Sequence, residues 1–109
     1  MRRVIYPDGR FDDLSYKIKW ESMKAIVCED PTSLAEMVYI HSWPEDILGP
    51  KPNMTHVMFL DEEGATDWHR GYPLVVNPLA TKIYHAQCMP GTTWPVRGTV
   101  YICPLDDYE

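Results

Sequence analysis

The sequence predicts one small α+β domain that spans residues 1–109. The length of 109 residues fits a single domain. A hydrophobic share of 45%, with 12% aromatic residues, is typical of a globular chain and argues against disorder, although there are ten prolines. Apolar residues recur with a period of two in some segments and with helical spacing in others. We therefore expect a small mixed sheet of about five strands with two short helices, in the order β-β-α-β-β-α-β.

The first half of the chain predicts three strands and a helix. Residues 3–7 form a short strand, and Asp8-Gly9 supplies a turn after it. Strict alternation over residues 14–20 predicts a second strand. The helical spacing of Trp20, Met23 and Val27 predicts a helix over residues 20–28, and the β-formers in residues 34–41 predict a third strand.

The second half is less regular. The prolines and the glycine of residues 42–55 predict a long loop, which is uncommon in a compact domain and often functional. Residues 56–60 read as a strand and 61–64 as a turn, followed by an irregular stretch over 65–73. Asn77 and Pro78 are strong N-cap and first-turn residues for a helix that reaches about residue 85. Residues 96–103 form the closing strand, and the tail over 106–109 is expected to be solvated.

The charge, the cysteine content and the distribution of apolar residues argue against several classes of protein. The net charge of -6 disfavours direct binding to nucleic acid, which needs clustered basic residues. Three cysteines without short spacing fit reduced thiols in the cytoplasm better than a disulfide framework. No apolar run approaches the length of a membrane span, and the first residues lack the apolar stretch of a secretory signal.

No motif predicts catalysis, a metal site or a cofactor. The four histidines and three cysteines lack the paired spacing of structural zinc sites. Asp61, Glu62 and Glu63 are consecutive, so we expect a solvated turn that Gly64 closes with a positive φ. There is no Gly-x-Ser-x-Gly sequence and no glycine-rich phosphate loop. Cys28 follows a predicted helix and is expected in the core. We therefore expect a protein that is not an enzyme.

The candidate binding residues are aromatic and basic side chains on the predicted loops, together with one helix start. Tryptophan, tyrosine and arginine dominate interface hot spots. The set consists of Trp68, His69, Arg70, Tyr72, Trp43, Trp94 and Asn77. For the loop aromatics, the alternative is that they fold back against the core. Asn77 also has two interpretations. It is either a purely structural cap or part of a helix start that holds a phosphate or carboxylate.

Three segments resemble a family of small domains of unknown function that bacteriophages and mobile elements encode. They are residues 58–64, the octet Asn77-Pro78-Leu79-Ala80-Thr81-Lys82-Ile83-Tyr84, and residues 97–102. The family reads as a strand ending in Asp/Asn-Glu-x-Gly, an Asn-Pro-x-Ala-Thr-x-x-Tyr helix and a Gly-Thr-Val-type final strand. The chain departs from the family at Cys28-Glu29, where a Gly-Gly pair is usual, and in a longer proline-rich insertion after His41. The resemblance implies a phage origin and an α+β fold, and it supplies no reaction.

Two functions follow as expectations. The first is a non-enzymatic phage accessory protein that binds a host protein in the host cytoplasm, for example a defence protein, and inhibits or modulates it. The alternative is an oligomeric protein, such as a homodimer, that sequesters a nucleotide or another small molecule. Aromatic rings for stacking, Arg70 for a phosphate and the helix start at Asn77 motivate this alternative.

Overall fold

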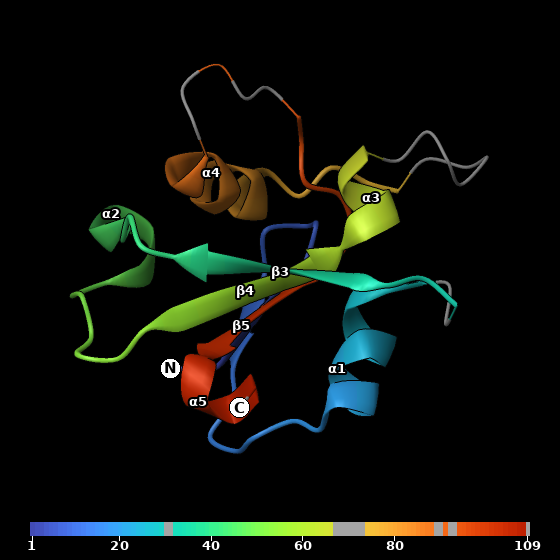
Figure 1. Ribbon diagram of the computed structural model, residues 1–109. Helices are drawn as coiled ribbons and strands as arrows, with labels where there is room; N and C mark the ends of the chain where they lie inside the picture. Colours follow the sequence, from blue (N-terminus) through green and yellow to red (C-terminus); the bar gives the residue numbers. More distant parts are fainter. Residues whose placement is uncertain (30–31, 67–73, 89–90, 92–93, 109) are drawn as a thin grey trace.

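The protein is a five-stranded antiparallel sheet with helices on both faces (Figure 1). The computed structural model describes residues 1–29, 32–66, 74–88, 91 and 94–108. The strand order is β2-β1-β5-β4-β3, and each neighbouring pair is antiparallel. The predicted α+β class is confirmed, but the predicted mixed pairing is wrong. Each strand instead runs opposite to its neighbours.

The elements have the following bounds. The strands are β1 (Arg3–Ile5), β2 (Phe11–Asp13), β3 (Ala35–Ile40), β4 (His56–Asp61) and β5 (Val100–Pro104). The helices are α1 (Trp20–Val27), α2 (Glu45–Leu48), α3 (Glu62–Thr66), α4 (Pro78–Gln87) and α5 (Leu105–Tyr108). The chain therefore contains the two predicted helices, α1 and α4, and three short helices that were not predicted.

Alternating side chains of β4 and β5 divide the core into two layers. Met58 and Ile102 belong to an upper core beneath α4, together with Ile83 of that helix. Phe59 and Tyr101 belong to a lower core above α1. In Figure 1, α3 and α4 lie above the sheet, and α1 and α5 lie below it. The two central strands are thus covered on both faces, as their continuous burial requires.

The predicted strand over residues 14–20 is wrong. The second strand is β2, three exposed residues that pair with β1 at the edge of the sheet. The apolar residues of the following segment, Leu14 and Ile18, pack instead against the lower core. Trp20 already begins α1. The two-residue alternation therefore reflects contact of an irregular segment with the core and not pairing within the sheet.

The predicted turn over residues 61–64 is also wrong, because α3 begins at Glu62. Asp61 is fully buried, and its Oδ1 accepts a hydrogen bond from the Glu63 N–H at 3.1 Å. Gly64 does not adopt a positive φ. A Cβ at this position would lie 2.8 Å from Cδ1 of Leu74 and 3.1 Å from Cβ of Asp61, so a larger residue would force the Leu74 side chain to move. The expected solvated carboxylate cluster is thus partly an interior feature.

Two further segments are more ordered than expected. The predicted long loop over residues 42–55 contains α2, whose Leu48 is buried in the upper core. The tail that was expected to be solvated contains α5, and Asp107 there forms an ion pair with Arg2 at 2.6 Å. The closing strand is shorter than predicted, since β5 begins at Val100.

Asn77 ties α4 to the sheet through its buried side chain. Its Oδ1 accepts a hydrogen bond from the Ala80 N–H at 3.1 Å, which confirms the predicted N-cap. Its Nδ2 donates to the carbonyls of Ile5 and Gly98, at 3.1 and 2.9 Å. One turn later, the Thr81 hydroxyl lies 2.8 Å from the Asn77 carbonyl. The amide therefore joins the start of α4, the end of β1 and the turn before β5.

We expect Asn77→Ala to lower the free energy of unfolding by about 3 kcal/mol, because it removes a cap and leaves two buried carbonyls unpaired. Asn77→Ser keeps an acceptor for the cap and should cost less, about 2 kcal/mol, from the two lost carbonyl bonds. Urea unfolding measures both values, with the exposed Asn53→Ala as control. A serine variant as stable as the wild type would show that the carbonyl bonds contribute nothing.

Candidate ligand-binding site

A pocket opens on the lower face of the sheet between α1 and α5. Its volume is about 630 Å³, within the range of small-molecule sites. Three parts of the chain line it: the segment before α1 with the first turn of that helix, the centre of β4 and β5, and α5. Figure 1 shows the two helices that border the pocket, α1 and α5, on the lower face of the sheet.

Four aromatic rings form one wall of the pocket. Phe59 and Tyr101 are cross-strand partners on β4 and β5, and their rings stack with centroids 6.4 Å apart. Trp20 meets Phe59 edge to face at 5.8 Å, and Tyr108 lies 5.6 Å from Phe59 and 5.8 Å from Trp20. Trp20 and Tyr108 remain 44% and 51% exposed. The wall thus runs from the buried sheet surface to an open aromatic rim.

The Tyr101 hydroxyl is buried in this wall without a hydrogen-bond partner. Tyr101 is 2% exposed, and its oxygen forms no well-aligned hydrogen bond within the described part of the chain; the Cys103 thiol beside it is only a weak partner. Burial raises the pKa of the Tyr101 phenol, and the Cys103 thiol beside it contributes in the same direction. A neutral hydroxyl left unpaired in the interior is costly. Such a group is a candidate donor for a ligand.

Cys103, on the same strand face, has a thiol whose pKa is raised. Burial raises its pKa to about 11, and the nearby Asp107 carboxylate adds to the shift. At neutral pH the reactive thiolate is therefore scarce. The floor of the pocket presents two protonated groups, which suits the recognition of a ligand better than attack on one.

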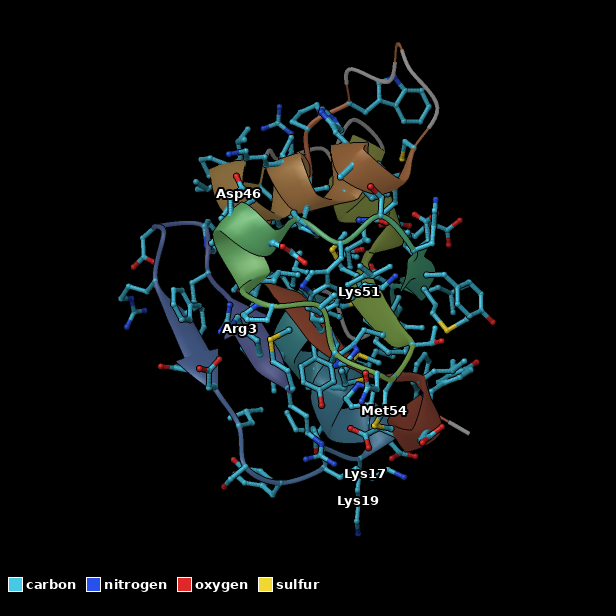
Figure 2. The ribbon with its side chains drawn as sticks, turned by 90° about the vertical axis from the view of Figure 1, so that its left-hand side faces the viewer. Arg3, Lys17, Lys19, Asp46, Lys51 and Met54 are labelled. Atoms are coloured by element: carbon cyan, nitrogen blue, oxygen red, sulfur yellow. The ribbon has the colours of Figure 1, made fainter. Side chains whose placement is uncertain are left out.

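The charged groups at the rim are unevenly distributed. Lys17 and Lys19 line the pocket and are exposed on the segment before α1, and Figure 2 shows them at the same end of the molecule. Asp107 also lines it, but Arg2 holds both of its oxygens, at 2.6 and 3.1 Å. The other lining carboxylate belongs to Glu21, in the first turn of α1. Counted together with Arg2, the charged groups of the pocket carry one net positive charge, in a protein of net charge -6.

Of the residues predicted from the sequence, the three that the structure describes do not line this pocket. Trp68, His69, Arg70 and Tyr72 fall outside the described residues. Trp94 is 62% exposed, beside the end of α4, where its carbonyl accepts a hydrogen bond from the His85 ring.

The other two candidates have structural roles. The Trp43 indole N–H donates to the Gly49 carbonyl at 2.8 Å, and the ring packs 5.2 Å from His56, so it folds back against the core. Asn77 is fully buried, and its amide is used within the fold. Asn77 is therefore closed to a ligand, whereas Trp43 is partly exposed and also lines a second pocket, of about 440 Å³.

Sequence reasoning missed the pocket because its residues come from distant parts of the chain. The sequence predicted that Trp20 contributes to the apolar face of the first helix and that Tyr108 belongs to a solvated tail. The pairing of Phe59 with Tyr101 joins two strands that are far apart in the sequence. One sequence feature could have pointed to the pocket, namely the helical spacing of Trp20, Met23 and Val27. Met23 and Val27 are the buried residues of α1, and Trp20 is at the start of the same helix face.

Comparisons of the chain with models of protein families, with curated proteins and with solved structures gave no match. The resemblance to the phage domain family therefore stays a prediction. None of the helices in the described part of the chain has the length and apolar character needed to cross a membrane. Function is argued below from the geometry.

We expect Tyr101→Phe to raise the free energy of unfolding by about 1 kcal/mol, because it removes a buried hydroxyl that no group satisfies. Tyr6→Phe is the matched control, since its hydroxyl donates to Asp12 at 3.0 Å and sits on the surface. That variant should be neutral or slightly less stable. Thermal and urea unfolding measure both. A loss of stability in Tyr101→Phe would mean that the hydroxyl has a partner.

Proposed function

We propose that the protein is a non-enzymatic binding protein that holds a small molecule in the pocket between α1 and α5. The observation that carries the proposal is the buried, unpaired Tyr101 hydroxyl in the wall of an aromatic pocket. Ligand sites are mostly apolar cavities with a few placed polar groups. This pocket combines four rings, one of them the phenol of Tyr101, with charged side chains.

The protonation states favour binding over reaction. A general base or nucleophile near neutral pH needs a pKa close to or below 7. Burial moves Tyr101 and Cys103 away from that range. Asp107 is engaged by Arg2 and is not positioned as an isolated base. These properties support a ligand that is bound unchanged.

A thermal-shift screen tests this proposal with nucleotides, nucleosides and small aromatic acids. A ligand at a hundred times its dissociation constant adds about 2.7 kcal/mol, which in a domain of this size raises the melting temperature by on the order of 10 °C. The shift should shrink in Trp20→Ala, because half of the aromatic rim is lost. Trp94→Ala is the matched control, as an exposed tryptophan outside the pocket. Flat melting curves across the panel would contradict the proposal.

A second candidate is the inhibition or modulation of a host protein by a phage accessory protein. The resemblance motivates it, and Trp94 favours it, since a largely exposed indole is a typical interface anchor. The affected partner would be a cytoplasmic host protein, for example one that acts in defence. This binding surface would lie beside α4, on the opposite side of the sheet from the pocket.

For this candidate, we expect a tagged copy to recover one defined protein from host lysate. Trp94→Ala should reduce the recovery at least about tenfold, because hot-spot tryptophans contribute about 2 kcal/mol or more. Trp20→Ala should leave the recovery unchanged. Equal recovery by the wild type and Trp94→Ala would remove this tryptophan from the interface.

A further inference from the structure

We propose that the ligand of the pocket between α1 and α5 is a planar aromatic molecule that carries an anionic group. The inference rests on the proposed binding function and specifies its chemistry. It combines the aromatic wall, the cationic rim and the unpaired hydroxyl. Each of these features selects for one part of such a molecule.

The aromatic wall selects for a planar ring. Trp20 and Tyr108 are in contact with each other and leave about half of their surfaces open. A ring that stacks on such a surface gains about 1–3 kcal/mol. An aliphatic ligand would fill the volume, but it would not gain the electrostatic preference of stacked rings. The wall therefore favours an aromatic ligand over an aliphatic one of equal size.

The rim selects for negative charge. Lys17 and Lys19 flank the opening, while Arg2 already pairs with one of the two lining carboxylates, that of Asp107. With Arg2 included, three cations face two lining carboxylates, an excess of one positive charge in a chain of net charge -6. An aromatic pocket can also hold an organic cation. Here the two lysines would repel it.

The start of α1 adds to this preference. Lys19 occupies the N-cap position and makes no capping hydrogen bond with its side chain, and the first-turn residues Trp20 and Glu21 line the pocket. Free N–H groups at a helix start attract anions. The buried Tyr101 hydroxyl, which forms no well-aligned hydrogen bond in the described part of the chain, is a second and independent polar feature of this pocket. Its raised pKa makes it a donor, which suits an oxygen of the ligand.

A matched pair of fluorescent probes tests the inference. 1-Anilinonaphthalene-8-sulfonate and N-phenyl-1-naphthylamine share one ring system, and only the first has a negative charge. We expect Lys17→Gln/Lys19→Gln to weaken binding of the sulfonate about fivefold, as two exposed charge interactions would. The Kd of this double variant for the neutral probe should equal that of the wild type. Lys51→Gln/Lys82→Gln changes the net charge equally, away from the pocket, and should leave both values unchanged.

The other outcomes show whether it is the binding function of the pocket or only the proposed chemistry of its ligand that fails. If Trp20→Ala weakens both probes and the Lys17 and Lys19 substitutions weaken neither, the pocket binds rings without selecting for charge, and the inference is overturned. If Trp20→Ala affects neither probe, the pocket does not bind them, and the proposed function itself fails.

Competition then distinguishes the possible sources of this chemistry. Displacement of the bound sulfonate by adenosine monophosphate at lower concentration than by indole-3-acetate assigns a nucleotide. The reverse order assigns an aromatic carboxylate. Displacement by neither compound at millimolar concentration would count against an anionic aromatic ligand.

Discussion

The buried amide of Asn77 is the interaction on which the arrangement of the sheet and α4 depends. It caps α4 and binds the carbonyl of Ile5 at the end of β1 and that of Gly98 before β5. Gly98 has a φ of +77°, a conformation that residues with a Cβ rarely adopt. Its N–H donates to the Val75 carbonyl, just before the cap. The segments on both sides of α4 are thereby fixed to each other and to β1.

This constraint explains why the octet from Asn77 to Tyr84 has its composition. Asn77 supplies one acceptor and two donors, which a serine or aspartate cap could not match. Pro78 needs no hydrogen-bond partner at the first helical position. Ala80 is fully buried, and the Thr81 hydroxyl accepts from the Val96 N–H at 2.8 Å. The pattern therefore specifies how a helix docks on a sheet, which is a structural function and not a catalytic one.

The same geometry positions the pocket. The turn at Gly98 leads into β5, whose alternate side chains face opposite layers. Val100 and Ile102 pack under α4, so Tyr101 and Cys103 must face α1 and α5. The upper core thus holds the strand in register, while the lower face carries an unpaired hydroxyl. A fold can retain such a cost where another interaction requires the group.

Local features could be predicted from the sequence, and features that depend on distant contacts could not. The cap at Asn77 and the apolar stripe of α1 lie within a few residues, so spacing alone revealed them. Asp61 to Gly64 has the composition of an exposed turn, yet the burial of Asp61 and the close approach of Leu74 to Gly64 place a helix there.

The pocket could not be predicted from the sequence, because it depends on contacts between residues that are far apart along the chain. It brings α1 together with β4, β5 and α5, and its aromatic wall depends on the register that opposes Phe59 to Tyr101. A tryptophan is informative only when its surroundings are known. Trp43 is a packing residue, Trp20 belongs to the pocket rim, and Trp94 is exposed elsewhere.

The net charge of this protein and the charges at its pocket favour binding partners of opposite sign. An overall charge of -6 favours a basic partner when the molecule is considered as one sphere. Charges separated by more than about 8–10 Å are largely screened at physiological salt, so a bound ligand responds mainly to the groups at its own site. At the pocket these are Lys17, Lys19, Glu21 and the start of α1, with Asp107 already paired with Arg2. An acidic protein can therefore present a site for an anion, provided that its carboxylates are paired or placed elsewhere.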